Sequence, residues 1–454
     1  MNGAPWIAFP FCLVVVTAGI CAASSMHLLN VAGVDTWLER LELDQMDFSV
    51  NTAPPDKLRL IYIGQGDTLP KVNGSFADEG ARQLWRREHA HLLQALGNAP
   101  RLVAFDLNFP APNDAKENQQ ASDEFAKAVR EARTRVIVGA ELNEQGLPQL
   151  IDSLKGAEWG LTQVGGLRLE HGQSKALIRR YVLARSQVPV GTPLVRQPAI
   201  PSLAVEMLLV DLSRPSTEPT SVALDTGKSE LVLFSGSTEL KRISCDIEPE
   251  IRNSGDRMPR LLATIPLHYP RTPEFVEEKY AQVLQRLSRV AADYRDKVVL
   301  LGARIEGEVA AEEGGELVVL APKPDERAPA YGYQVHASVY SDLLLDTYPR
   351  RLRGVWQLLM LLVLGFLSGV GRKILPKSDV EVDTKILGKR NVPIGLLILT
   401  GVYAVIVWLF CRSAFIVFDV AYGALAVVAS YFLCGSVLIR DRKIGRRGLN
   451  DSPG

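Results

Sequence analysis

The oxygen-bearing side chains that follow one apolar stretch are the first candidates for chemistry in this sequence. Asp106 comes directly after the apolar residues 103–105, where a buried strand is expected to end. Ligands of open α/β sheets bind outside the carboxyl ends of such strands. Asn108, Asn113 and Asp114 follow closely and add oxygens that suit a polar ligand or a hard cation. We take Asp106, Asn108 and Asp114 as candidate ligand-binding residues, while the alternative that Asp106 only caps a loop stays open.

No motif for catalysis, cofactor binding or metal binding accompanies these residues. The sequence has no P-loop, nucleophile elbow, zinc-protease motif or paired CxxC, and the turn at 64–67 is too short to cradle a phosphate. His89 and His91 lie two residues apart and point to different sides of a helix, which disfavours joint metal ligation. For His336, at the start of a helical pattern, a structural hydrogen bond is the simpler role. We expect no catalytic residue, no metal site, no cofactor and no enzymatic activity.

The elements that must position these residues are expected to be alternating strands and helices. Strands are predicted at 58–64, 101–109, 135–139, 230–234 and 297–302, and helices at 81–96, 122–133, 201–210, 273–294 and 335–345. Several of the strands are apolar on both faces, which is typical of a sheet covered by helices on both sides. We therefore predict an α/β domain with a mixed, largely parallel sheet covered by helices, and surface loops at 186–201, 213–220 and 321–329.

Four apolar runs lie outside this domain, one near the start of the chain and three near its end. They cover residues 6–23, 354–370, 392–410 and 414–439, and each approaches the length that a membrane-spanning helix needs. The first run lacks the preceding positive charge of a signal peptide, which favours an uncleaved anchor. Gly365 and Gly369 form a small-xxx-small pair that would let helices pack closely, within the bundle or in a dimer, although glycine is also simply frequent in membrane helices.

Basic residues set the expected orientation, because Lys and Arg in short loops stay on the cytoplasmic side of a membrane. They are concentrated between the second and third apolar runs and after the last one. The predicted domains are an anchor at 1–31, an extracytoplasmic domain at 32–350, membrane helices at 354–370, 392–410 and 414–439, a basic cytoplasmic loop at 371–391 and a cytoplasmic tail at 440–454. We expect a multi-pass protein of the plasma membrane with its C-terminus in the cytoplasm.

The charge balance and the cysteines argue against two further classes of protein. Lys plus Arg and Asp plus Glu number 51 each, and no basic block with interleaved aromatic residues occurs in the middle of the chain. Nucleic-acid binding is therefore disfavoured. Of the five cysteines, only Cys245 lies between the first and second apolar runs. The large domain therefore cannot form an internal disulfide and must be stabilised by its hydrophobic core.

Six segments of the sequence, in this order, resemble the second type of CHASE domain. They are RREHAHLL at 86–93, VAFDLNFPAPND at 103–114, LIRRYVL at 177–183, PSLAVEML at 201–208, DKVVLLGARIEGE at 296–308 and YGYQVHASVYSDLLL at 331–345. This family comprises extracytoplasmic sensory domains found beside bacterial adenylate cyclases and histidine kinases, commonly followed by three closely spaced membrane helices. The chain departs from the family at Ile63–Gly64, where the first strand usually ends in Asp, and after the late strand, where the acid is at best Glu306 or Glu308.

The resemblance implies a sensor of the bacterial inner membrane. Family members often continue into a cytoplasmic cyclase, kinase or phosphatase module, whereas this sequence stops fifteen residues after its last apolar run. We therefore expect a membrane-anchored sensor that binds an unknown small ligand, relays the signal to a separate cytoplasmic or membrane protein, and forms a homo-oligomer. The alternative is a structural or assembly subunit of an envelope membrane complex. Apart from these partners we expect only the lipid bilayer.

Overall fold

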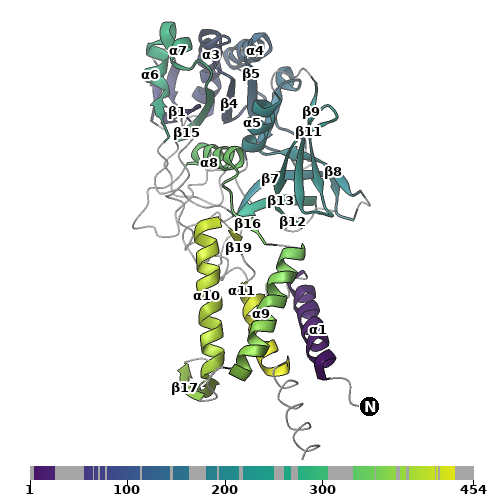
Figure 1. The fold of residues 1–454 in the computed structure, drawn as a ribbon. Helices are drawn as coiled ribbons and strands as arrows, with labels where there is room; N and C mark the ends of the chain where they lie inside the picture. Colours follow the sequence, from purple (N-terminus) through teal and green to yellow (C-terminus); the bar gives the residue numbers. More distant parts are fainter. Residues whose placement is uncertain are drawn as a thin grey trace, which may run out of the picture. The chain divides into compact units, whose positions relative to one another are not determined.

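The computed structural model describes residues 5–25, 56–162, 180–249, 260–266, 275–304 and 331–434, apart from short gaps. The gaps are 65, 70–71, 77–78, 113–114, 144–146, 192–193, 214–217, 353, 375–378, 385–387, 415 and 418–419. The chain divides into two compact units, whose elements are drawn in Figure 1. Phe48–Tyr348 is called the α/β unit here, and Met1–Asp47 with Pro349–Gly454 is called the helical unit.

Six strands of the α/β unit form one parallel sheet. Their order is β14 (Glu277–Lys279), β1 (Leu58–Gly64), β15 (Val298–Arg304), β4 (Leu102–Asn108), β5 (Arg135–Ala140) and β6 (Glu158–Leu161). Every neighbouring pair is parallel. β15 comes late in the chain but lies between β1 and β4, with Gly302 opposite Asp106 and Arg304 opposite Gly64.

Helices cover both faces of this sheet (Figure 1). One face carries α3 (Glu79–Leu96), α4 (Lys116–Glu131), α6 (Tyr280–Gln285) and α7 (Leu287–Asp293), and the other carries α5 (Leu203–Leu212) and α8 (Gly332–Leu345). Along β4 the side chains alternate between two cores, since Val103 and Phe105 join the first and Leu102 and Ala104 the second. Burial on both sides explains why β4 has no polar residue before Asp106.

A second sheet of seven strands is antiparallel. Its order is β11 (Thr238–Ser244), β10 (Glu230–Ser235), β9 (Thr220–Asp225), β8 (Arg196–Pro201), β7 (Arg180–Pro189), β13 (Arg260–Pro266) and β12 (Asp246–Pro249). α5 packs between this sheet and the parallel sheet, which is why nearly all of its residues are buried and apolar. The outer strands β11 and β12 are joined through Cys245 alone, so the sheet curls until its two edges meet at that residue.

The curled sheet corrects the prediction of a single, largely parallel sheet. The predicted strand at 230–234 forms β10 of the curled sheet, and the predicted loop at 186–201 contains the end of β7 and all of β8. Two of the prolines in that predicted loop lie where β8 has a neighbouring strand on one side only. Pro198 pairs with β9 and Pro201 with β7. A residue without an N–H group fits such positions, because one side of the strand needs no donor.

Most predicted helices are confirmed, and one is interrupted. The expected segments at 81–96, 122–133, 201–210 and 335–345 form α3, α4, α5 and α8 with shifted ends. Within 273–294, β14 precedes α6, and Arg286, with φ −121° and ψ 30°, separates α6 from α7. The smaller elements are the hairpin of β2 (Thr68–Leu69) and β3 (Val72–Ser75) and a 3-10 turn at Asp152–Leu154. The predicted loop at 321–329 lies outside the described residues.

The helical unit contains α1 (Pro5–Ser25), α9 (Gly354–Ile374), α10 (Ile394–Ala414) and α11 (Val420–Ala429), the last followed by a π-helical turn at Ser430–Cys434. Between α9 and α10, β17 (Asp379–Thr384) and β18 (Gly388–Pro393) form an antiparallel hairpin, and β16 (Arg350–Arg351) pairs with β19 (Ile416–Val417). The run predicted as one helix at 414–439 therefore contains β19, α11 and the π-helical turn.

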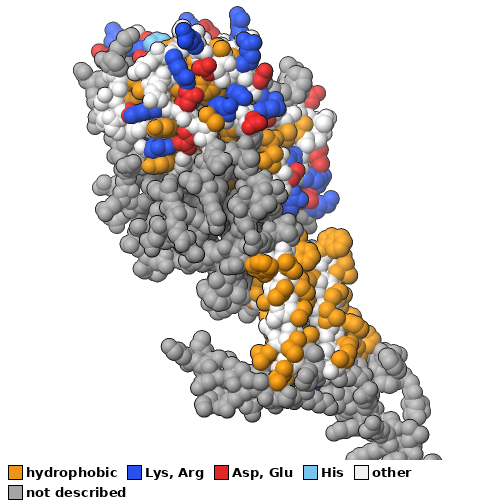
Figure 2. Space-filling view, turned by 60° about the vertical axis from the view of Figure 1, so that its left-hand side comes forward, with side chains coloured by type: hydrophobic (Ala, Val, Ile, Leu, Met, Phe, Trp, Pro, Cys, Tyr) orange, Lys and Arg blue, Asp and Glu red, His pale blue; other side chains and the backbone are white. Residues whose placement is uncertain are grey.

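The helical unit exposes a large apolar surface. Among the described residues, Val355–Arg372 is long and apolar enough to cross a membrane, and shorter apolar helices cover Phe9–Ala22, Ile394–Phe410 and Val420–Leu433. Figure 2 shows hydrophobic side chains over much of the visible surface of these helices, whereas charged side chains gather on the α/β unit. Extended apolar surface of this kind marks contact with a membrane or with another protein.

Candidate functional site

Asp106 lies at the carboxyl end of β4, in the middle of the parallel sheet. Its side chain is only 4% exposed and turns to the face covered by α5 and α8, where His336 Nε2 lies 3.5 Å from Asp106 Oδ1. Gly302 on the neighbouring strand leaves room for this arrangement, because a Cβ at that position would lie 2.3 Å from Tyr333 Cβ. The strand and α8 therefore place a carboxyl group and an imidazole together in a buried position.

The imidazole of His336 is fixed by two hydrogen bonds. Its Nε2 lies 3.1 Å from the carbonyl oxygen of Thr162, and its Nδ1 lies 2.6 Å from the hydroxyl oxygen of Tyr181. A carbonyl oxygen can only accept, so Nε2 carries the hydrogen and Nδ1 accepts from Tyr181. The oxygen of Tyr181 in turn accepts from Ser202 and from the backbone N–H of Ala204, at the start of α5. The His336 side chain thus connects both sheets with α5 and α8.

Burial sets the protonation of these groups. It raises the pKa of Asp106 from 3.8 to about 8 and lowers the pKa of His336 from 6.5 to about 4. Burial also raises the pKa of Tyr181. Near neutral pH, Asp106 is therefore mostly protonated, His336 is neutral and Tyr181 keeps its hydrogen. The contact between Asp106 and His336 joins two neutral groups and is not an ion pair.

A polar path leads from this buried pair to the surface. Thr162, whose carbonyl accepts from His336, donates its own hydroxyl to Asn108 Oδ1 at 3.0 Å. Asn108 Nδ2 donates to Glu141 Oε1 at 2.6 Å, and both of these side chains are exposed. Gly139 permits the close approach, because a Cβ there would lie 2.3 Å from Thr162 Cγ2. The carboxyl ends of β4, β5 and β6 therefore form one polar edge.

The three residues predicted to bind a ligand have different outcomes in the structure. Asp106 and Asn108 both lie at this polar edge and are linked through His336 and Thr162. Asp114 lies outside the described residues, and a ligand role for any of the three stays a prediction. Within the described ranges, no group of three or more His, Cys, Asp or Glu side chains is placed to hold a metal ion.

The sequence did not indicate the partners of Asp106. Tyr181 lies in a segment that carried the family resemblance but received no role, and His336 was expected only to make a structural hydrogen bond. His336 does make such bonds, and it also lies against the Asp106 carboxyl. The other predicted histidines differ from each other as expected, since His89 is buried and bonded to Tyr280 at 2.8 Å, whereas His91 is 42% exposed.

A second polar cluster lies beside the site, at the end of β15. Arg304 Nη2 lies 2.5 Å from Glu277 Oε2 and donates to the hydroxyl of Tyr333 at 3.1 Å. Gln334, in the first turn of α8, donates to Glu277 Oε1 at 2.6 Å. The Arg304 guanidinium also lies 4.0 Å above the ring of Tyr62. The positive charge of Arg304 is thus already compensated by Glu277.

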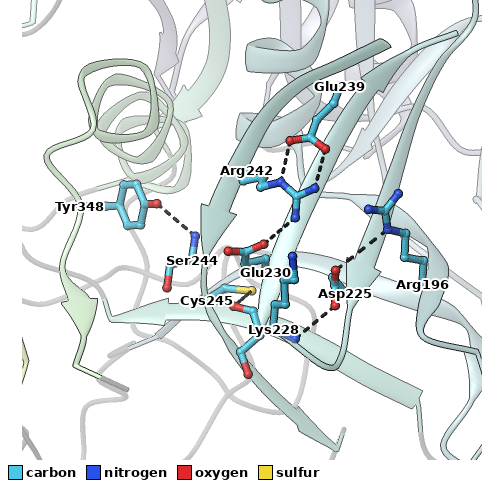
Figure 3. Close-up of polar contacts among 10 residues, drawn as sticks. Arg196, Asp225, Lys228, Glu230, Glu239, Arg242, Ser244, Cys245 and Tyr348 are labelled. Atoms are coloured by element: carbon cyan, nitrogen blue, oxygen red, sulfur yellow. Dashed lines mark hydrogen bonds and ion pairs between the residues drawn. The ribbon is translucent and has the colours of Figure 1, made fainter. Parts of the chain in front are cut away.

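The far end of α8 is attached to the curled sheet. Asp346, in the left-handed conformation that ends α8, pairs with Lys241 of β11 at 3.0 Å. The backbone N–H of Ser244 donates to the Tyr348 hydroxyl at 3.1 Å (Figure 3). Tyr348 is buried in the same core as α5 and α8. The segment that follows α8 is therefore held against β11 by two polar contacts and by hydrophobic packing.

The charged side chains on the curled sheet mainly compensate one another (Figure 3). Arg242 donates to Glu239 at 2.6 Å and to Glu230 at 2.8 Å, and Arg196 lies 4.0 Å from Asp225. Asp225 is buried and the pairs of Arg242 are only partly exposed, so each of these acids already has a basic partner. We therefore do not place a ligand site on this surface.

Gly365 and Gly369 lie on buried parts of α9 in the helical unit. A Cβ at Gly365 would lie 2.6 Å from Leu13 Cδ1 and 2.8 Å from Ser430 Oγ, so α1 and the π-helical turn approach α9 closely there. Ser368, one turn further along, donates its hydroxyl to a carbonyl of α11. Close packing at Gly365 is thus satisfied within the chain's own bundle.

Comparison with known proteins gives one result. No curated protein and no solved structure matches the chain. The family model described as the CHASE2 domain matches residues 15–371, which is more than half of the chain. The match includes the polar edge with Asp106, the curled sheet, α8 and most of α9. The resemblance found in the sequence is therefore confirmed, and the chain belongs to the CHASE2 family of sensory extracellular domains.

Proposed function

We propose that this protein is a membrane-anchored receptor that binds a small ligand at Asp106 on the polar edge and relays the binding signal to a separate protein. The observation that carries the proposal is the state of the Asp106 carboxyl. It is buried, and His336 Nε2, which lies 3.5 Å away, already serves the Thr162 carbonyl. The sensory character of CHASE2 domains supports the same interpretation.

A buried carboxyl without close donors favours a functional role over a structural one. Burying such a group costs free energy unless hydrogen bonds compensate it, and shifted pKa values of this kind cluster at functional sites. The position adds to this, because ligands of parallel α/β sheets bind at the carboxyl ends of the strands. A ligand that donates hydrogen bonds to Asp106 would supply what the protein itself does not.

The relay in this proposal is α8. His336 contacts Asp106 in the first half of the helix, and the helix ends at Leu345, shortly before α9 begins at Gly354. A ligand that draws Asp106 away from His336 would shift α8. The contacts of Asp346 and Tyr348 with β11 would then have to adjust, which alters the segment leading to α9. Coupling of this kind requires two states of α8 that the ligand binds differently.

The membrane frame of the proposal uses α1, α9, α10 and α11 as four spanning helices, with the α/β unit outside the cytoplasm. The basic residues of 371–391 and 440–454 support the cytoplasmic location of both segments. In this arrangement, a cytoplasmic or membrane signalling protein binds these segments and produces the response. A homo-oligomer would bring two such surfaces together.

A ligand screen on the full-length protein in detergent tests the binding part of the proposal. A compound that binds the folded state raises the melting temperature, because it adds about 2.7 kcal/mol to the free energy of unfolding when its concentration is a hundred times Kd. We expect compounds that stabilise the wild type and the Asp152→Asn control but not Asp106→Asn, since Asp152 is an exposed acid far along the chain. Compounds that stabilise Asp106→Asn equally would contradict a site at Asp106.

Amide hydrogen exchange tests the relay with the same compounds. We expect ligand binding to change exchange in α8 and in residues 346–352, and Tyr181→Phe, which removes a hydrogen bond to His336, to reduce that change. Binding without any change in these residues would argue against a relay and for a role as an assembly subunit.

A further inference from the structure

The donors around Asp106 are already committed to other acceptors. His336 Nε2–H serves the Thr162 carbonyl, and the Tyr181 hydroxyl serves His336 Nδ1. Asn108 gives its amide group to Glu141. None of these donors makes a hydrogen bond with Asp106, although His336 Nε2 lies 3.5 Å from it, so acceptors exceed donors among the residues described at this edge of the sheet.

Among the described residues, the uncompensated charges at the same edge are of one sign. Glu141 is an exposed carboxylate whose only compensation in the described contacts is the neutral amide of Asn108. On the side of β15, Arg304 is compensated by Glu277 at 2.5 Å. On the side of α8 and β7, burial keeps His336 and Tyr181 neutral. When Asp106 ionises, the described residues of this edge therefore carry two acids and no unmatched base.

Resting on the proposed function, we propose that the ligand of this site is a small organic cation whose ammonium group donates hydrogen bonds to the Asp106 carboxylate. Glu141 attracts the cation to this edge of the sheet. A metal ion suits the site less well, because the described residues provide no group of three ligating side chains. An ammonium group brings its own hydrogen-bond donors and needs only one buried carboxylate as a charge partner.

A proton competes with the ligand for the Asp106 carboxylate. Because burial raises the pKa of Asp106 to about 8, the carboxyl is protonated below that pH. An ammonium ion binds the carboxylate form, so the O–H bond of Asp106 breaks and one proton passes to solvent, while no bond of the ligand changes. Apparent affinity then rises about tenfold for each pH unit up to about 8 and levels off above it. Among the described residues, His336 and Tyr181 are the titratable groups that face Asp106, and both stay neutral throughout.

Calorimetric titration of the full-length protein in detergent measures both effects. The probes are methylammonium, ethanolammonium and putrescine at constant ionic strength, with tetramethylammonium as a cation that lacks N–H donors and acetate as an anion. We expect primary ammonium ions to bind about fiftyfold more tightly near pH 8, where about half of the Asp106 carboxyls are ionised, than near pH 6. Titrations in two buffers of different protonation enthalpy should show about one proton released near pH 6. Acetate should not bind.

Variants identify the group responsible. Asp106→Asn should remove both the binding and the proton release, Glu141→Gln should weaken binding several-fold with a smaller dependence on salt, and Asp152→Asn should behave as the wild type. The wild-type pH profile is an independent measurement should Asp106→Asn fold poorly. Equal binding by Asp106→Asn, binding without proton release, absence of binding by all three ammonium probes, or a preference for acetate would overturn the proposal.

Two results separate this proposal from the receptor proposal. A neutral or anionic ligand that requires Asp106 and changes exchange in residues 346–352 would overturn the cation and leave the receptor intact. Ammonium binding with proton release but without a change in those residues would support the cation and contradict the relay.

Discussion

Asp106 makes the stability of this protein depend on pH with a definite sign. The unfolded chain loses this proton near pH 4, whereas the folded chain keeps it up to about pH 8. Between these values the folded state holds the extra proton, so the contribution of Asp106 to stability falls as pH rises, by up to about 1.4 kcal/mol per pH unit. His336 has the opposite sign, because its lowered pKa reduces stability as pH falls from 6.5 to about 4.

Replacing Asp106 by Asn should remove the first of these effects. We expect Asp106→Asn to be more stable than the wild type near pH 8, with the difference shrinking towards pH 4, since His336 contributes to both proteins. Thermal unfolding of the full-length protein across this range measures it. Asp152→Asn is the control, because Asp152 is exposed and the hydrogen bond and charge of Lys155 lower its pKa. A wild-type slope in Asp106→Asn would contradict the pKa shift.

At the scale of single residues, the sequence indicated Asp106 but not what surrounds it. The end of β4 can be located from the local sequence, because the strand is buried on both faces and its residues before Asp106 are therefore apolar. The bond between Tyr181 and His336 joins positions 155 residues apart. It exists only because α5 and α8 pack between two sheets, and no local pattern carries that information.

At the scale of elements, the strands that are nearly continuous apolar runs in the parallel sheet were predictable, whereas most strands of the curled sheet were not. β1, β4, β5 and β15 are nearly continuous apolar runs, and all were predicted within about two residues of their ends. β11, with the sequence TELKRIS, buries only Ile243 and resembles a surface loop in composition. Its strand conformation depends on pairing with β10, which the surrounding sheet provides.

The contact between Tyr348 and β11 predicts a local effect on that strand. Tyr348→Phe removes the acceptor of the Ser244 N–H group, a hydrogen bond with a net contribution of about 1 kcal/mol. We expect exchange of the Ser244 amide to accelerate about fivefold, with less change elsewhere in the curled sheet. Tyr62→Phe is the control, because the Tyr62 ring lies against Arg304 and its hydroxyl makes no hydrogen bond in the described part of the chain. Unchanged protection at Ser244 would contradict the contact.

The packing of α9 against α1 predicts an asymmetry between two glycines. Gly365→Leu would place its side chain into Leu13 and Ser430, whereas Gly401 of α10 has no atom within 4 Å of its Cβ position. Overpacking of this kind costs about 1–3 kcal/mol. We expect Gly365→Leu to lower the melting temperature of the protein in detergent and Gly401→Leu to leave it nearly unchanged. Equal effects, or a loss of oligomer mass without a loss of stability, would place Gly365 in a contact between chains.

At the scale of the whole molecule, the proposed orientation can be tested with single cysteines. Leu147 is 61% exposed in the α/β unit, and Lys389 lies in the basic segment between α9 and α10. We expect a membrane-impermeant maleimide to label Leu147→Cys in intact cells, and to label Lys389→Cys only after the cells are opened. Labelling of Lys389→Cys in intact cells would contradict the proposed orientation of the membrane helices.

The late arrival of β15 in the chain has a consequence for synthesis. β15 separates β1 from β4, yet more than 180 residues follow β4 before it appears, among them the whole curled sheet. Until residue 304 is available, β1 and β4 present unpaired edges to each other and to other chains. A truncated product ending before β15 should therefore aggregate or be degraded and not persist as a smaller domain. We therefore expect the nascent chain to need protection from aggregation until β15 has been synthesised.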